Sequence, residues 1–145
     1  MSLDVDIRGM KELQDFIKAF PDHGIRVIDE ELFKITNDLR NDIINSMRNT
    51  NKSIGNYYGN HKSSSPGFPP AIDTGNLINR MIIRDGYGFS ELFLKNVKYA
   101  KWLEEGTKKM KARPFFKPAI DRMDWQKRIR NRLIAERFAG RRLDE

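Results

Sequence analysis

The sequence predicts an α+β domain: a small, mainly antiparallel sheet with a hairpin, packed against a long helix, a short N-terminal helix and a C-terminal helix. Apolar residues recur every three or four positions over residues 22–48, which is the period of a helix with one buried face. Two apolar segments, 77–84 and 89–95, flank a glycine-containing turn, which is typical of a β-hairpin. The length of 145 residues corresponds to a single domain.

The first third of the chain is predicted to hold a strand and two helices. Residues 3–8 alternate apolar and polar side chains, as a strand does. Helical spacing over residues 10–20 predicts a short helix, which Pro21 ends. The long helix follows over residues 22–48. Its apolar stripe consists of Ile28, Leu32, Ile35, Leu39, Ile43 and Met47.

Residues 50–73 differ in composition from their surroundings. They are rich in Asn, Ser, Gly, Pro and Lys, and Ile54 and Ile72 are their only isoleucines. Structureless connections of this length are uncommon inside compact domains, where they are usually functional or disordered. We interpret the segment as a long mobile arm, which either docks on a partner or is an insertion without a role.

The last third is predicted to hold two helices separated by a basic loop. Residues 99–105 form a short helix that Gly106 ends, and residues 108–114 form the loop. A single final helix then runs from Pro118 to near Gly140, and residues 139–145 form a frayed basic tail.

The final helix shows apolar residues on two opposite sides when it is drawn at 100° per residue. One side can pack on the domain's own core, and the other then needs a partner, most simply a neighbouring subunit. The first side contains Ile120, Met123, Ile134 and Phe138. The second side, our predicted oligomer interface, contains Trp125, Ile129 and Leu133.

The positive charge of the chain lies at its C-terminal end. The net charge is +7, of which residues 1–105 contribute −1 and residues 106–145 contribute +8. Such an end meets nucleic acid or an acidic protein surface, although a solvated basic helix gives the same pattern. We expect the loop residues to face DNA or an acidic partner. These residues are Lys108, Lys109, Lys111 and Arg113.

The sequence offers no catalytic or metal-binding constellation, so we predict no enzymatic activity, no cofactor and no metal site. Cysteine is absent, which excludes disulfides and thiolate chemistry. The tripeptide Asp73-Thr74-Gly75 occurs in dimeric aspartic proteases, in which two carboxylates share a proton. Here two prolines precede the tripeptide and Asn76 follows it, so we favour a turn in which Gly75 permits the bend.

A dense signature begins at Tyr99, and a shorter one opens the predicted hairpin. The first comprises Tyr99, Ala100, Trp102, Glu104, Gly106, Thr107, Pro114, Phe115, Pro118 and Ala119. The second comprises Thr74, Gly75 and Leu77. In this order and spacing, the residues resemble the small head–tail joining (tail-completion) proteins of long-tailed bacteriophages, the gene-product-ten-like family of lambdoid phages. We expect Tyr99, Trp102 and Leu103 to lie on the hairpin.

The resemblance implies a structural virion protein, encoded by a phage or a prophage, that acts by assembling into a ring, commonly of six subunits. The ring would sit at the neck of the virion and would be present in the host bacterial cytoplasm during assembly. Its partners would be further copies of itself, the connector or adaptor protein, the tail-tube or tail-terminator protein, and genomic DNA passing non-specifically through the lumen, with no membrane partner. The alternative is a basic host protein that binds nucleic acid.

Overall fold

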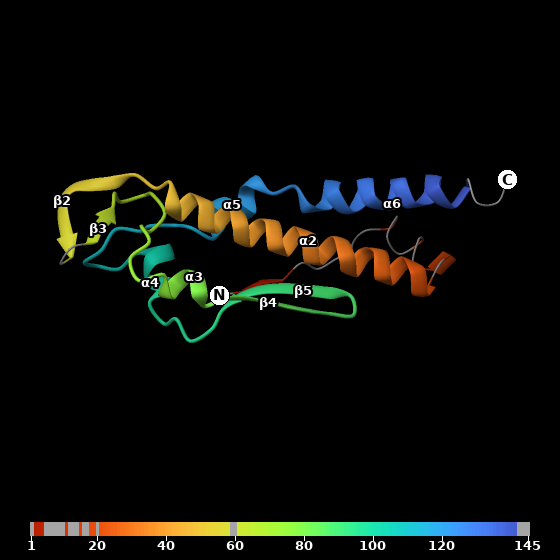
Figure 1. Ribbon diagram of the computed structural model, residues 1–145, viewed down its shortest axis with the longest axis horizontal. Helices are drawn as coiled ribbons and strands as arrows, with labels where there is room; N and C mark the ends of the chain where they lie inside the picture. The colour runs from red at the N-terminus through yellow and green to blue at the C-terminus, as the bar shows by residue number, and fades with distance from the viewer. Residues whose placement is uncertain are drawn as a thin grey trace.

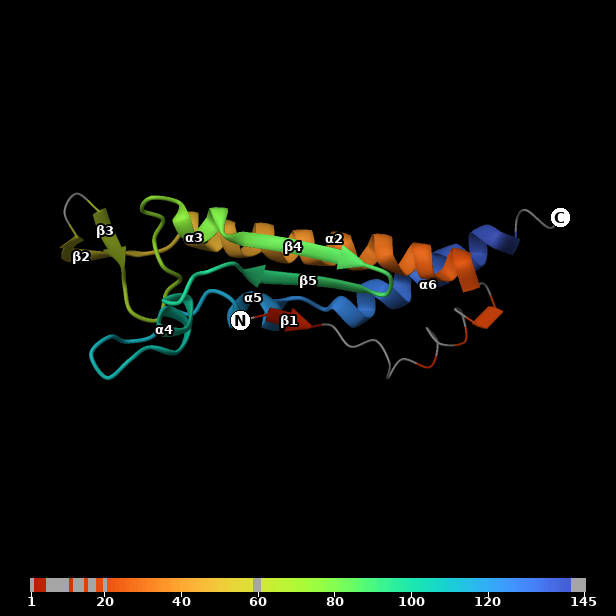
Figure 2. The same cartoon turned by 90° about the horizontal axis from the view of Figure 1, so that it is seen from below.

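The computed structural model describes residues 2–4, 11, 15, 18, 19, 21–58 and 61–141. The molecule is elongated, and two helices, α2 (Pro21–Arg48) and α6 (Trp125–Arg141), lie side by side along it (Figure 1). A sheet packs on α2, and two short helices and a second small sheet gather at one end (Figure 2). The predicted α+β class is confirmed. Among the described residues, no helix combines the length and the apolar character needed to cross a bilayer.

Helix α2 has 28 residues and is about 42 Å long at 1.5 Å per residue. The predicted apolar stripe is confirmed, because each of its six residues is at most 2% exposed. The C-terminal half of the stripe packs in one cluster with Leu92, Phe115 and Phe116. The N-terminal half packs in a second cluster with Ile129 and Leu133. The apolar face of α2 therefore packs on the sheet and α5 along its C-terminal half, and on α6 along its N-terminal half.

The larger sheet contains β1 (Ser2–Asp4), β4 (Met81–Gly86) and β5 (Phe89–Leu94) in the order β1-β5-β4, and both pairings are antiparallel. Strands β4 and β5 form the predicted hairpin. Gly86 pairs with Phe89, so Tyr87 and Gly88 make a two-residue turn, in which Gly88 has the positive φ of 78° that such turns favour.

The predicted strand over residues 77–84 is wrong at its start, where the chain forms the short helix α3 (Asn76–Asn79). Gly75 has φ 77°, and its carbonyl accepts a hydrogen bond from the Asn79 backbone N–H at 2.9 Å. This left-handed residue turns the chain into a helical turn, which places Leu77 in the core at 7% exposure.

The expectation that residues 50–73 lack secondary structure is also wrong. They contain β2 (Lys52–Tyr58) and β3 (His61–Ser64), which pair as a two-stranded antiparallel sheet. The strands pair at Lys52 with Ser64, at Tyr57 with Lys62 and at Tyr58 with His61, and the register is irregular between Lys52 and Tyr57. Backbone pairing of this kind does not require apolar side chains. Beyond β3, the Gly67 N–H donates to the Ala112 carbonyl at 2.9 Å. The mobility of the arm stays a prediction.

The single final helix is wrong, because the structure has two helices, α5 (Lys117–Arg122) and α6. Met123 between them is extended, with φ −92° and ψ 115°. Asp124 then begins α6: its carboxylate accepts a hydrogen bond from the Lys127 N–H at 3.0 Å, as an N-cap residue does. The backbone of α6 continues to Arg141, so residues 139–141 of the predicted frayed tail are helical.

The predicted oligomer interface is wrong. The prediction assumed one continuous helix, and the break between α5 and α6 changes which side of the later helix faces the core. Ile129 is 1% exposed and Leu133 is 6% exposed, and both pack on α2 of the same chain. Trp125 is partly buried against the same cluster. In contrast, Ile134, which lies on the side predicted to face the core, is 47% exposed.

Two predictions fall largely outside the described residues. The strand over residues 3–8 is described only where β1 reaches Asp4. The helix over residues 10–20 is described only at residues 11, 15, 18 and 19, which are helical. Residues 142–145 of the predicted tail also lie outside the described part.

Candidate functional site

The signature beginning at Tyr99 folds into one unit around the carboxylate of Glu104. This side chain lies at the end of α4 (Ala100–Glu105) and reaches the first turn of α5. Its Oε2 accepts hydrogen bonds from the N–H groups of Phe115 at 2.9 Å and Phe116 at 3.0 Å, and its Oε1 accepts one from Lys117 at 2.8 Å. The first N–H groups of a helix have no partner within the helix, and a negative charge suits that end. Glu104 therefore joins two helices that are separated by a loop.

Gly106 and Thr107 close the basic loop. Gly106 has φ 78°, and a Cβ there would lie 2.8 Å from the Ala112 nitrogen and 2.9 Å from the Met110 oxygen. The Thr107 hydroxyl accepts hydrogen bonds from the N–H groups of Lys109 at 3.2 Å and Met110 at 3.1 Å. The Gly-Thr pair is thus needed where the chain turns tightly back on itself.

The aromatic pair of the signature belongs to the core. Phe115 and Phe116 are each 1% exposed, and their rings meet edge to face with centroids 5.9 Å apart. Ala119 is also 1% exposed, and Pro118 lies in the first turn of α5, where its missing N–H leaves no helical bond unmade.

The two signatures meet through a hydrogen bond from the Asn76 side-chain amide to the Tyr99 hydroxyl at 3.1 Å. The Thr74 hydroxyl accepts a hydrogen bond from the Asn76 N–H at 3.4 Å. On α4, Ala100 is 3% exposed, whereas Trp102 is 57% exposed, so the expectation that Trp102 lies on the hairpin is wrong. Residues two apart lie on nearly opposite sides of a helix, so burying Ala100 turns Trp102 outward.

The predicted basic loop divides into three exposed lysines and one engaged arginine. Lys108, Lys109 and Lys111 are exposed and form no ion pair within the described part of the chain. Arg113 is half-buried, and its Nε donates to the Ser64 carbonyl at 3.3 Å. Arg113 therefore connects the loop to β3, and the lysines supply the exposed charge.

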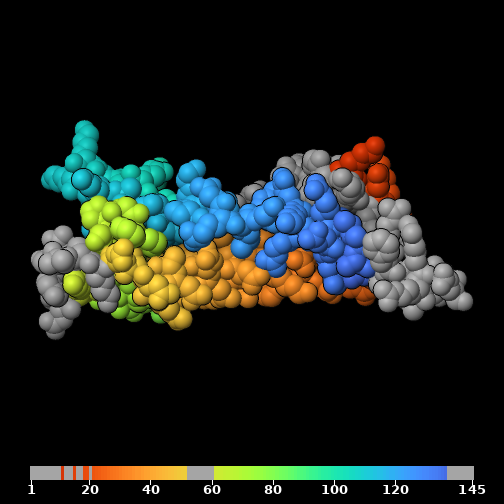
Figure 3. All heavy atoms as spheres, turned by 90° about the horizontal axis from the view of Figure 1, so that it is seen from above, coloured from red at the N-terminus to blue at the C-terminus, as the bar shows by residue number. Residues whose placement is uncertain are grey.

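Three arginines of the remaining basic segment form ion pairs within the molecule, because α6 lies along α2 (Figure 3). Arg122, just before α6, pairs with Asp42 at 2.6 Å, and within α6 Arg128 pairs with Asp38 at 2.7 Å. The further contacts of this side are Arg128 with Glu31 at 3.4 Å, Arg132 with Glu30 at 3.6 Å and Arg132 with Glu136 at 2.9 Å. The paired arginines of α6 therefore meet carboxylates that lie mainly on α2 of the same chain, a contact that the sequence does not predict.

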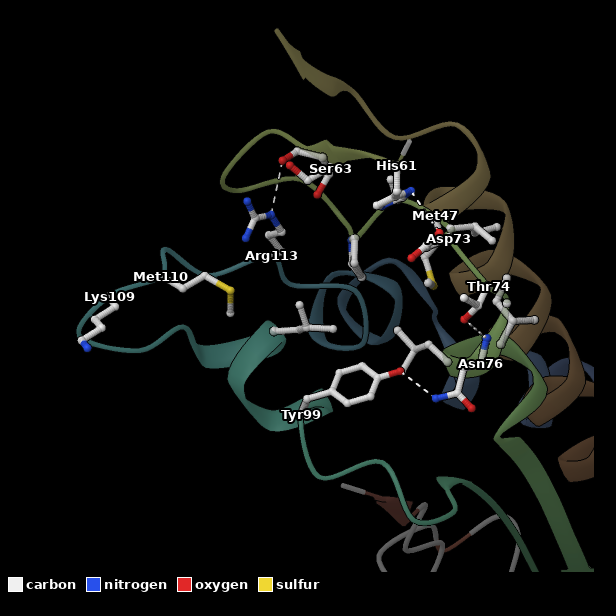
Figure 4. A pocket seen from close by; sticks show the side chains of 18 residues that line it. Met47, His61, Ser63, Asp73, Thr74, Asn76, Tyr99, Lys109, Met110 and Arg113 are labelled. Atoms are coloured by element: carbon white, nitrogen blue, oxygen red, sulfur yellow. Dashed lines mark hydrogen bonds and ion pairs between the residues drawn. The ribbon is translucent and has the colours of Figure 1, made fainter. Parts of the chain in front are cut away.

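The Asp73-Thr74-Gly75 tripeptide lies at a cavity of about 740 Å³ between β3, α3 and α4 (Figure 4). Asp73 is the only carboxylate among the described residues that line it, and its side chain is 60% exposed. The His61 Nδ1 lies 3.7 Å from Asp73 Oδ1. An aspartic-protease site needs two apposed carboxylates, whereas here the tripeptide forms the predicted turn into α3. Among the described residues, no group of three His, Cys, Asp or Glu side chains is placed to hold a metal ion.

Comparisons of the chain with protein-family models, with curated proteins and with solved structures each gave no match.

Proposed function

We propose that this chain is a structural subunit of a tailed phage or prophage that joins the head to the tail and acts by assembly. The observation that carries the proposal is the ordered pair of signatures, Thr74-Gly75-x-Leu77 and the block over residues 99–119, which resembles the head–tail joining family. The roles of its residues support the proposal, because they are structural: Glu104 caps a helix, Gly106 permits a tight turn and Phe115 fills the core. A scaffold of this kind serves to present surfaces to other proteins.

Part of the C-terminal positive charge is used in ion pairs within the chain, which leaves fewer free cations for general binding to nucleic acid than the sequence suggests. A sequence-independent DNA-binding surface needs several free cations, whose release of counterions makes binding salt-dependent. Arg122, Arg128 and Arg132 are paired with carboxylates of the same chain. The three exposed lysines of residues 108–111 form a small patch at one end, which suits one rim of a ring or a contact with an acidic partner.

Deleting the gene from the phage or prophage that encodes it tests the proposal. The deletion is expected to yield filled heads and complete tails that remain separate in electron micrographs, and a plasmid copy of the gene is expected to restore joined particles. Joined, infectious particles in the deletion strain would overturn the proposed function. Binding of the purified chain to random duplex DNA, lost as the salt concentration rises, together with normal particles in the deletion strain, would favour the nucleic-acid-binding alternative instead.

A further inference from the structure

A groove lies between the first half of α2 and the tip of the β4–β5 hairpin, far from the basic loop. It has a volume of about 430 Å³, and we call its apolar lining residues, Ile25, Phe33 and Tyr87, the apolar floor. Phe33 is 44% exposed there and Tyr87 is 76% exposed. We call it the acidic groove, after the carboxylates that line it. The lining residues are Asp22, Ile25, Arg26, Asp29, Glu30, Phe33, Asp85 and Tyr87.

The groove has more negative than positive charge, since its lining contains four carboxylates and one arginine. Two of the carboxylates are engaged: Asp29 accepts a hydrogen bond from the Gly88 N–H at 2.7 Å, and Glu30 lies 3.6 Å from Arg132. Asp22 and Asp85 are exposed and have no ion-pair partner in the described part of the molecule. An apolar floor with free carboxylates at its rim suits a partner that presents both an apolar side chain and cations.

The end of the molecule that contains the basic loop presents that combination. The loop with Lys108, Lys109 and Lys111 lies beside α4, where Trp102 is 57% exposed. We call this surface the basic end. The basic end lies near β2 and β3 at one end of the long axis, whereas the hairpin tip lies farther along that axis, beside the first half of α2 (Figures 1 and 2). One molecule therefore cannot bring its own basic end to its own acidic groove.

We infer that the basic end of one copy docks in the acidic groove of a second copy. The lysines approach Asp22 and Asp85, and Trp102 covers the apolar floor at Phe33 and Tyr87. Each copy then uses one end as donor and the other as acceptor, which is a heterologous contact that closes into a ring or continues as a filament. DNA is excluded as the occupant of the groove, because its phosphates and the carboxylates have the same charge. The inference rests on the proposed function for its biological setting, and it needs only self-association to be tested.

Two charge-reversal variants of equal size test the contact by the solution mass from light scattering. The groove variant is Asp22→Lys with Asp85→Lys, and the loop variant is Lys108→Glu with Lys111→Glu. The unchanged chain is expected to form species larger than the 17.0 kDa protomer at low salt and to dissociate as salt rises. Each variant alone is expected to lose this association, whereas an equal mixture of the two regains it. The mixture works because each contact again joins opposite charges.

The control is Lys127→Glu with Arg130→Glu, which changes the charge by the same amount on an exposed part of α6 and is expected to leave the mass unchanged. Circular dichroism and thermal unfolding show that all variants are folded. The inference is overturned if the unchanged chain stays at 17.0 kDa at every concentration, or if the mixture of the two variants does not associate. Association of the groove variant by itself also overturns the inference, because the contact would then not depend on the groove carboxylates. None of these results changes the particle phenotype of the gene deletion, so the proposed function is judged separately.

Discussion

Glu104 and Glu105 are adjacent in α4 and have the same side chain, yet their surroundings differ. Glu104 accepts three backbone hydrogen bonds from residues 115–117, whereas Glu105 has only an exposed ion pair with Lys101 at 4.0 Å. Replacing Glu104 with Ala leaves three N–H groups without their acceptor, which is expected to lower the free energy of unfolding by about 2 kcal/mol. Glu105→Ala is the matched control, with an expected change within about 0.5 kcal/mol. Urea denaturation measures both, and equal losses would contradict the capping role.

Gly106 and Gly88 allow a similar comparison, because both have φ 78°. A Cβ at Gly88 meets nothing within 4 Å, whereas at Gly106 it would lie 2.8 Å from the Ala112 nitrogen. The cost of a positive φ is expected in both alanine variants, at about 1–2 kcal/mol. Gly106→Ala carries an added steric cost, because backbone must move, so we expect its melting temperature to fall further than that of Gly88→Ala. Similar melting temperatures for the two variants would show that the loop accommodates the Cβ at position 106 without a loss of stability.

At the scale of elements, the packing of α6 on α2 replaces the predicted oligomer interface. Ile129 is 1% exposed in this packing, and Ile134 on the same helix is 47% exposed. Ile129→Ala is expected to lower the free energy of unfolding by about 3 kcal/mol, and Ile134→Ala by less than about 1 kcal/mol. The loss is expected to be the same at every protein concentration, because both sides of the contact belong to one chain. A loss that grows on dilution would restore Ile129 to an interface between subunits.

The elements that the sequence predicts well are those whose signals are local. The stripe of α2 follows from helical spacing alone, and the β4–β5 hairpin follows from its turn glycines. The break before α6 also has a local signal, because Asp124 directly before Trp125 is a typical N-cap, but the apolar residues on both sides suggested one continuous helix. The β2–β3 hairpin has few apolar residues, so its strands give little periodic signal.

Contacts between distant segments could not be predicted in the same way. The acids of α2 and the arginines of residues 122–132 are visible in the sequence, but their pairing depends on which helix faces meet. The same holds for Glu104, whose three partners lie 11 to 13 residues away across a loop. The basic loop follows from the sequence, and its lysines are exposed, but their contact with DNA or an acidic partner stays a prediction. The hydrogen bond from Arg113 to β3 depends on the fold.

At the scale of the whole molecule, the basic end and the acidic groove lie apart along the long axis (Figure 2). Ion pairs join α2 to Arg122, Arg128 and Arg132, whereas the lysines of the basic end and two carboxylates of the acidic groove form no ion pair within the described residues. This separation gives an elongated subunit two different charged surfaces. Such a subunit is suited to repeated assembly, which is the role that we propose for it.

The most direct measurement of that role is the fraction of joined particles, counted by electron microscopy, after the purified chain is added to an extract of the gene-deletion strain. The proposed function predicts that separate heads and tails become joined as the chain is added, and that an equal amount of the Glu104→Ala variant joins fewer of them. An extract in which heads and tails stay separate at every concentration of the folded chain would contradict the account.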